Sequence, residues 1–153
     1  MFFSDRVAGY REAGRVLRPG GKFVFNVWGH ISQNVFADDV TNALKDVFPE
    51  DPPLFLARTP HGYHDVEQIR RELEEAGFGN VAIETRNALS RAPSPRHPAV
   101  AYCQGTPLRN EIESRGAAKL EAATDHAAAV IANKHGEGEV AAKIQGHVIE
   151  AIA

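Results

Sequence analysis

Residues 15–28 read RVLRPGGKFVFNVW, and this stretch decides the fold class. Upstream of it, apolar residues recur at helical spacing from Val7 to Leu17, which predicts an amphipathic helix. The turn at residues 18–21 ends that helix, because proline cannot continue it and two glycines permit a tight reversal. Residues 22–28 are apolar on both alternating faces. Such a pattern is typical of a strand that is covered on both sides inside an α/β sheet.

The rest of the chain alternates helical and extended patterns. These patterns predict helices over 36–47, 65–76, 106–113 and 117–134, a strand over 78–86, and loops over 49–64 and 89–98. Residues 54–56 are expected to be a short extended piece within the first loop. The last segment, 140–152, fits either a helix face or a strand. This order of elements indicates an α/β fold.

Composition limits the possible partners. The 153 residues suffice for one domain, 1–153, with a real core. A net charge of −3 provides no basic surface for nucleic acid or for a membrane, so we expect neither as a partner. No apolar run approaches the ~20 residues of a membrane-spanning helix. The single cysteine, Cys103, reads as a small buried apolar residue and favours a cytoplasmic location.

Residues 10–25, YREAGRVLRPGGKFVF, resemble a signature of class I S-adenosylmethionine-dependent methyltransferases. In that family a helix reading like EAxRVL runs through RPGG or KPGG into an apolar strand. Residues 75–78, EAGF, resemble the join that precedes the family's sixth strand, and residues 1–3 resemble the end of its fourth. The resemblance covers residues 1–86. It implies a partial Rossmann-like sheet of family strands five, seven and six with helices on its faces, and a variable helical insertion over 87–139 before a last strand at 140–152.

The family binds S-adenosylmethionine with a glycine-rich turn after its first strand and an acidic residue at the end of its second. The sequence has no match to either, since the GEGE of residues 136–139 follows a predicted helix. The resemblance therefore implies the C-terminal portion of a methyltransferase for an unknown small-molecule acceptor, inactive alone and without tight cofactor binding. Two alternatives stay open. One is a non-enzymatic dimerisation or small-molecule-binding module derived from the fold, and the other is a chain that pairs with a separately encoded N-terminal half.

Aromatic residues provide the first site candidates. Phe2 and Phe3 follow the expected end of the fourth strand and would border the cofactor in the intact family; core filling is the alternative. Trp28 ends the strand at 22–28, which corresponds to the family's fifth, on the side where open α/β sheets bind ligands. It is either a pocket residue or a core anchor.

The loop His61-Gly62-Tyr63-His64 offers two imidazoles and a phenol that could orient or deprotonate an acceptor. In the alternative, Tyr63 packs on the core while His61 and His64 are solvated. We expect no metal site, because the sequence shows no third ligand.

Two further candidates, Tyr102 and Arg109, lie in the expected insertion. Arg109 could hold an acidic acceptor. A surface ion pair with Glu113, four residues on, is the competing interpretation.

The resemblance leaves the strand at 22–28 without the family's fourth strand beside it. The strand at 22–28 would lie at an unpaired edge, and a long apolar edge recruits another chain. We therefore expect a homodimer formed through this edge around a two-fold axis.

Overall fold

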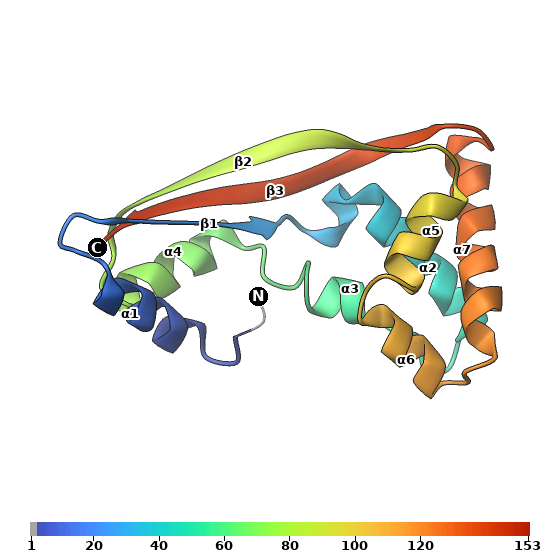
Figure 1. The fold of residues 1–153 in the computed structure, drawn as a ribbon, viewed down its shortest axis with the longest axis horizontal. Coiled ribbons are helices and arrows are strands. Elements are labelled where there is room, and N and C mark those ends of the chain that lie inside the picture. The colour runs from blue at the N-terminus through green and yellow to red at the C-terminus, as the bar shows by residue number, and fades with distance from the viewer. Residues whose placement is uncertain (1–2) are drawn as a thin grey trace.

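The computed structural model describes residues 3–153 of the chain, and Phe2 lies outside the described residues (Figure 1). This part contains helices and three strands in mixed order. In chain order they are α1 (Arg6–Val16), β1 (Lys22–Trp28), the 3-10 helix η1 (Ile31–Gln33), α2 (Val35–Val47), α3 (Phe55–Arg58), α4 (Val66–Glu75), β2 (Gly79–Ala92), α5 (Arg96–Cys103), α6 (Leu108–Ser114), α7 (Lys119–His135) and β3 (Val140–Ile152).

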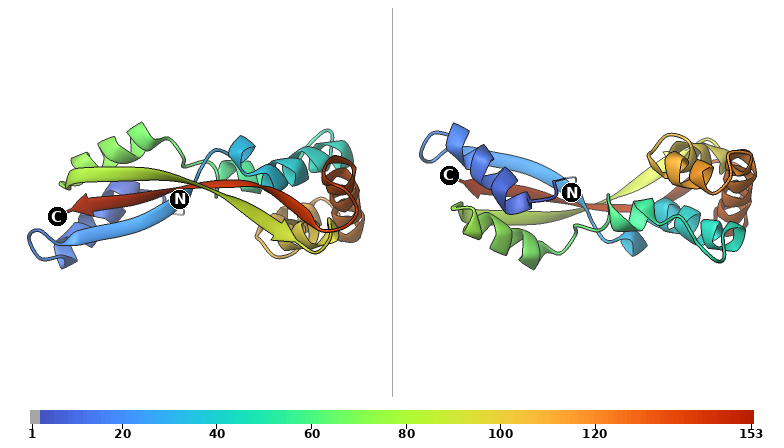
Figure 2. Two further views of the ribbon diagram at one scale, coloured as in Figure 1. Left: turned by 90° about the horizontal axis from the view of Figure 1, so that it is seen from above. Right: turned by 90° about the horizontal axis from the view of Figure 1, so that it is seen from below.

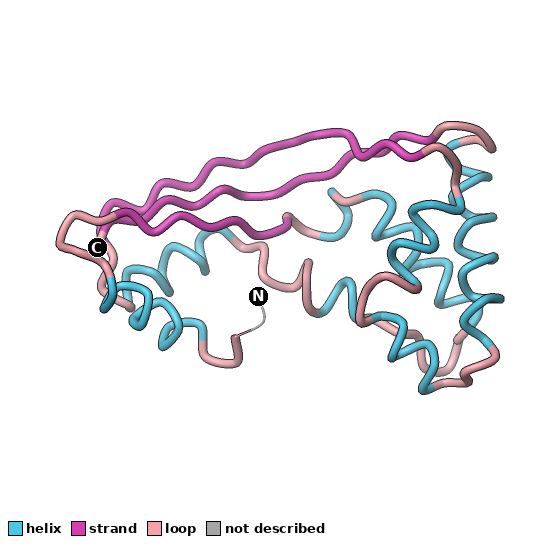
Figure 3. Tube along the Cα trace, viewed as in Figure 1, coloured by secondary structure: helices cyan, strands magenta, loops and turns pink. Residues whose placement is uncertain are grey.

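The three strands form one sheet in the order β1-β3-β2 (Figure 3). The prediction of a mixed fold of helices and strands is confirmed. Both pairings are antiparallel, which differs from the parallel arrangement usual in Rossmann-type sheets. The last segment of the chain, which the sequence left open between helix and strand, is the central strand β3.

The structure shows a side-chain cap at the start of α4 and glycine turns after α1 and α4. Asp65 caps α4, since its carboxylate accepts hydrogen bonds from the backbone N–H groups of Glu67 and Gln68. Gly77 follows α4 with a φ of +97°, and Gly20 turns the chain between α1 and β1 with a φ of +77°. Glycine adopts these left-handed conformations without the steric cost that a Cβ would bring.

The helices form two groups along the length of the sheet (Figure 1). At one end, α1 and α4 lie against the sheet and enclose a cluster of buried residues that includes Tyr10, Ile69, Leu73 and Ile149. At the other end, α2, α3, α5, α6 and α7 enclose a second, larger cluster. Helices α5 to α7, between β2 and β3, build much of that second cluster, at the place where the sequence predicts a helical insertion.

Strand β3 contributes to both clusters with opposite faces. Val140 and Ala142 are buried in the larger cluster, whereas Ile149 and Ala151 are buried in the smaller one. The register between β2 and β3 is continuous from Ala82 to Ala92, so no bulge produces this change. The twist of the β2–β3 ribbon does, and Figure 2 shows the two strands crossing.

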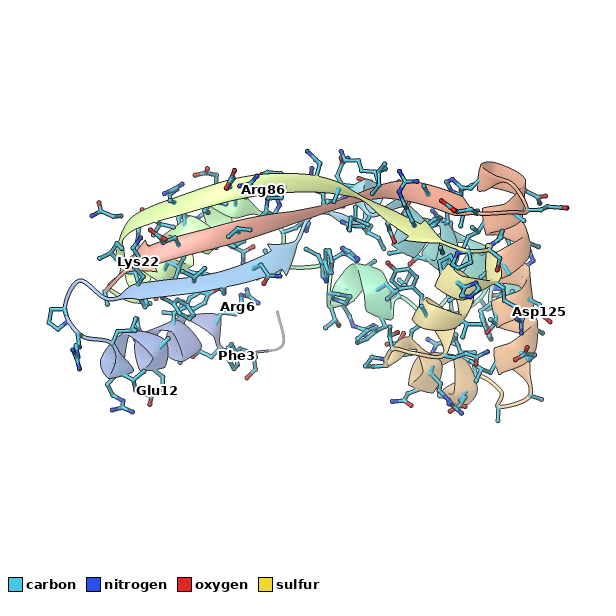
Figure 4. All side chains as sticks on the ribbon, turned by 45° about the horizontal axis from the view of Figure 1, so that its top comes forward. Phe3, Arg6, Glu12, Lys22, Arg86 and Asp125 are labelled. Atoms are coloured by element: carbon cyan, nitrogen blue, oxygen red, sulfur yellow. The ribbon has the colours of Figure 1, made fainter. Side chains whose placement is uncertain are left out.

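Strand β1 is not covered on both faces, and that prediction is wrong for this chain. Phe25 and Val27 pack into the smaller cluster. Val24 is 56% exposed and Trp28 41% exposed, because no helix of the described part covers their face of the sheet. Arg86 of β2 projects from this same open side (Figure 4).

Three boundaries also differ from the sequence prediction. Residues 89–92 belong to β2 and not to a loop, because they pair with β3 from Lys143 to Val140. Residues 55–58 form α3 and not an extended piece, and residues 96–103 form α5. None of the described helices is both long and apolar enough to cross a membrane.

The two faces of β3 provide a stability test. Ile149 is fully buried, and its neighbour Val148 is 40% exposed on the open face. We expect Ile149→Ala to lower the free energy of unfolding by about 2–5 kcal/mol, because it leaves a cavity in the smaller cluster. Val148→Thr, which keeps the β-branched shape, should change it by less than about 0.5 kcal/mol. Urea denaturation measures both, and equal losses would contradict the assignment of the two faces.

Candidate functional site

A cavity of about 300 Å³ lies beyond the carboxyl end of β1, between the sheet and the larger helical group. Its volume falls at the small end of the range for ligand pockets. Its wall is mainly aromatic and aliphatic with a few polar groups. The lining residues are Trp28, Asn34, Phe55, Leu56, Pro60, His61, Ser90, Tyr102, Thr106, Pro107 and Ile144.

His61 provides the wall with a neutral base. Its side chain is buried, and its Nδ1 lies 2.9 Å from the carbonyl oxygen of Gly29. A carbonyl only accepts, so Nδ1 carries the proton and Nε2 is left as an acceptor. Burial lowers the pKa of His61, and the nearby His30 and His64 lower it further. The imidazole is therefore uncharged at neutral pH.

Trp28 forms the neighbouring part of the wall. It is the last residue of β1, and its ring centroid lies 6.2 Å from that of His61. The backbone N–H of Gly29 donates to Gln145 on β3, which fixes the chain directly after the tryptophan. A Cβ at Gly29 would come within 2.6 Å of Oε1 of Gln145, so any larger residue there requires that side chain to move.

Asn34 holds this corner together, and the sequence prediction missed it. Its buried Nδ2 donates to the carbonyls of Gly29 and His30, and its Oδ1 accepts from the backbone N–H of Gln145. The Gly29 carbonyl thus accepts from both Asn34 and His61. Nothing in the sequence marks Asn34 beyond its position before α2, where an asparagine reads as an ordinary helix cap.

Tyr102 reaches the cavity from α5. Burial raises the pKa of its phenol, which is therefore protonated at neutral pH. Among the described residues no hydrogen-bond partner is found for this hydroxyl. Thr106, by contrast, has its hydroxyl engaged by the Tyr102 carbonyl and the Leu108 N–H.

His64 lies beside the cavity without lining it. Its Nδ1 is 2.8 Å from the His61 carbonyl oxygen, and its ring meets that of His30 edge-on at 4.7 Å. His147 lies on β3 opposite Thr85 of β2, and its Nδ1 is 3.0 Å from the Thr85 hydroxyl. Burial lowers the pKa of His147. Within residues 3–153, no three His, Cys, Asp or Glu side chains are placed to hold a metal ion.

Tyr63 is not part of the cavity wall but of the smaller cluster. Its hydroxyl lies 2.9 Å from that of Tyr10 and donates to Glu72 at 2.6 Å, and the Arg6 guanidinium lies 4.3 Å from its ring centre. Burial and the hydrogen bonds to Glu72 and Tyr10 raise the pKa of Tyr63. Only Gly62 separates Tyr63 from His61 in sequence, yet the two side chains lie in different environments.

Glu72 of α4 anchors that network. Its side chain is 16% exposed and forms a bidentate pair with Arg6 at 2.9 and 3.0 Å. Burial alone would raise the pKa of Glu72. Hydrogen bonds from Arg6, Tyr63 and Gln68 outweigh burial and hold that pKa at about 2.

The remaining candidates lie away from the cavity. Arg109 forms the ion pair with Glu113 that competed with an acceptor role, at 2.8 Å on the surface of α6. Phe3 is 64% exposed and packs against Gly9 (Figure 4). It borders a shallow hollow beneath β1 and is not among the residues that line the cavity. Phe2 lies outside the described residues.

The described residues do not fit a tight S-adenosylmethionine site. The three strand ends carry no glycine-rich turn with an acidic partner. After β1 the single Gly29 is enclosed by Gln145, and both its backbone groups are bonded. The glycines at 136 and 138 lie between α7 and β3.

The chain matches no protein-family model and no curated protein. The chemistry of the site is therefore that of its own wall, which is uncharged and mainly apolar and carries one imidazole acceptor, the phenol of Tyr102 and the hydroxyl of Ser90.

The Glu72 network generates an acid-stability prediction. The pKa of Glu72 lies below its ordinary 4.5, so the stabilisation is present above that value and is lost as pH falls through about 2. We expect Glu72→Gln to lower the free energy of unfolding at neutral pH by about 1.5–3 kcal/mol. It should also flatten the dependence of stability on pH in the acid range.

The matched control is Glu12→Gln, which removes an exposed pair with Arg15 on α1. This change should have little effect on stability, because exposed pairs are screened. Denaturation curves from neutral to acid pH compare the variants. Equal pH dependence in Glu72→Gln and the parent chain would contradict the assignment.

Proposed function

We propose that this chain is the C-terminal portion of a class I S-adenosylmethionine-dependent methyltransferase that acts on a small-molecule acceptor. The observation that carries the proposal is the free edge of β1. That strand emerges directly from the RPGG turn and pairs on one side only among the described residues. The resemblance expects another strand at this edge.

The pattern of backbone hydrogen bonds defines the free edge. Gly29 and Gly21 bond to Gln145 and Ala153 of the β3 side. Because bonded residues alternate in an antiparallel ladder, the N–H and C=O groups of Val24, Asn26 and Trp28 point away from β3. A neighbouring strand could bond to all of them.

The order of the strands supports the same proposal. The resemblance expects family strands five, seven and six, and the observed order is β1-β3-β2. Strands β1 and β2 run in the same direction, since each is antiparallel to β3. The parallel strands typical of a complete Rossmann-type sheet would then lie beyond the β1 edge, in the portion that we propose is missing.

The open face of the sheet is a further argument. Val24, Trp28 and Val148 are apolar and at least 40% exposed on it. Doubly wound sheets carry helices on both faces. Helices that follow the missing strands would cover these side chains.

In this proposal the cavity beside Trp28 is the acceptor side of the enzyme. His61 Nε2 is placed to accept a proton from a methyl-acceptor molecule that enters the cavity. Methyl transfer also requires positioning in a dry aromatic surround, which Trp28 and Phe55 supply. A cytoplasmic location is part of the proposal and agrees with one buried, unpaired cysteine, Cys103.

The upstream coding DNA tests this proposal. We expect an in-frame segment that encodes a strand, a glycine-rich turn and a helix. Isothermal titration with S-adenosylmethionine should show no tight binding to residues 1–153 and clear binding to the extended polypeptide. Nanomolar binding to residues 1–153 alone, or no binding by the extended polypeptide, would contradict the proposal. A stable dimer without such a segment upstream would favour a non-enzymatic module.

The chain by itself should form a homodimer through β1. A second copy offers the same row of unpaired backbone groups, and two edges can pair antiparallel around a two-fold axis. Asn26→Pro tests this, because it removes an N–H that points away from β3 and leaves the β1–β3 ladder intact. Light scattering after size exclusion should show dimer for the parent chain and monomer for Asn26→Pro.

The matched control for this prediction is Val24→Thr on the same strand, which keeps the backbone N–H and should remain dimeric. Circular dichroism confirms that each variant is folded. A monomeric parent chain, or a dimer that survives Asn26→Pro, would contradict pairing through this edge.

A further inference from the structure

The cavity beside Trp28 contains no formal charge. Of its eleven lining residues none is an acid, a lysine or an arginine. Arg58, two residues after the lining residue Leu56, is engaged by Glu111. A charged ligand would lose its hydration and gain no partner, so the cavity selects against both carboxylates and ammonium groups.

Its polar groups are few and differ in availability. Asn34 has both side-chain atoms bonded, and the Thr106 hydroxyl both donates and accepts. His61 has Nδ1 committed to Gly29, which leaves Nε2. That leaves Nε2 of His61 as an acceptor and the hydroxyls of Tyr102 on α5 and Ser90 on β2, all of which border the same space.

We propose that this cavity binds an uncharged aromatic alcohol of the phenol class. Its hydroxyl donates to Nε2 of His61 and accepts from the hydroxyl of Tyr102. Its ring lies among Trp28, Phe55 and Ile144. A ligand with one O–H can satisfy both His61 and Tyr102, and its apolar body fills the space along the remaining wall.

This ligand class deepens the proposed function, and its role as methyl acceptor rests on that proposal. Binding itself does not, because the cavity is complete within residues 3–153. A binding experiment without cofactor therefore separates the two: failure of the upstream segment or of cofactor binding leaves the phenol site standing, and the reverse also holds.

Trp28 makes the test direct, since it is the only tryptophan of the chain. We would titrate 4-tert-butylphenol and follow tryptophan fluorescence, with 4-tert-butylanisole and 4-tert-butylbenzoate as matched ligands. The anisole lacks the O–H donor and the benzoate carries a charge. The phenol should change the fluorescence saturably, and each comparison ligand should bind about tenfold or more weakly.

Two variants assign the polar contacts. Tyr102→Phe removes only the hydroxyl, and His61→Asn removes the Nε2 acceptor. Each should weaken phenol binding about tenfold while leaving anisole binding nearly unchanged. His126→Gln, a half-exposed histidine on α7, is the control and should bind as the parent chain does.

A second measurement keeps the proposal testable if His61→Asn fails to fold. Nitrogen chemical shifts of His61 in the parent chain should report a proton on Nδ1, and phenol should shift Nε2. Equal affinity for phenol and anisole would overturn recognition of the hydroxyl. Absence of any saturable change, or tighter binding of the benzoate, would overturn the site.

Discussion

The twist of the β2–β3 ribbon is the constraint on which the rest of the molecule depends. Side chains alternate strictly along a strand, so a flat ribbon would present the same set of residues to all the helices. Here Val140 and Ala142 face one group of helices while Ile149 and Ala151 face the other. Two-stranded ribbons twist strongly, and the accumulated rotation exchanges the inward face without a bulge. One strand can therefore support both clusters of buried residues.

The cavity lies where this exchange takes place. Trp28 and Ile144 lie on the same face of the sheet. That face is exposed at the end of the sheet that carries the smaller cluster, and it is covered by helices at the end that carries the larger one. The larger helical group reaches this point through Phe55, Leu56 and Tyr102, and the wall is completed by the segment that carries Asn34 and by the loop that carries His61. Both bond to the carbonyl of Gly29, which ties the two connections to the end of β1.

The loop at residues 61–64 contributes one side chain to the cavity and another to the smaller cluster. His61 lines the cavity, whereas Tyr63 points into the smaller cluster and bonds to Glu72. The partly buried Glu72 carboxylate accepts hydrogen bonds from Arg6, Tyr63 and Gln68, and its pair with Arg6 links α4 to α1. The loop therefore connects the cavity wall, through His61, with an ion-pair network outside the cavity, through Tyr63.

The sequence by itself determined the local structure of this chain. This includes the turn at Pro19 and Gly20, the cap at Asp65, the left-handed Gly77, and the mixed order of helices and strands. These depend on near neighbours, whose chemistry is visible in a short window. It also singled out Trp28, His61 and Tyr102, three candidates that the fold brings to one cavity.

Only the tertiary structure decided which faces are buried and which polar groups meet. The open face of β1, the extension of β2 through Ala92, and the Arg6–Glu72 pair all depend on residues distant in sequence. The same holds for Asn34, whose partners include Gln145, more than a hundred residues away. Periodicity reports that a strand has two faces, but burial is set by what the rest of the chain places against them, and the accumulated twist of a ribbon leaves no mark in the alternation of residues.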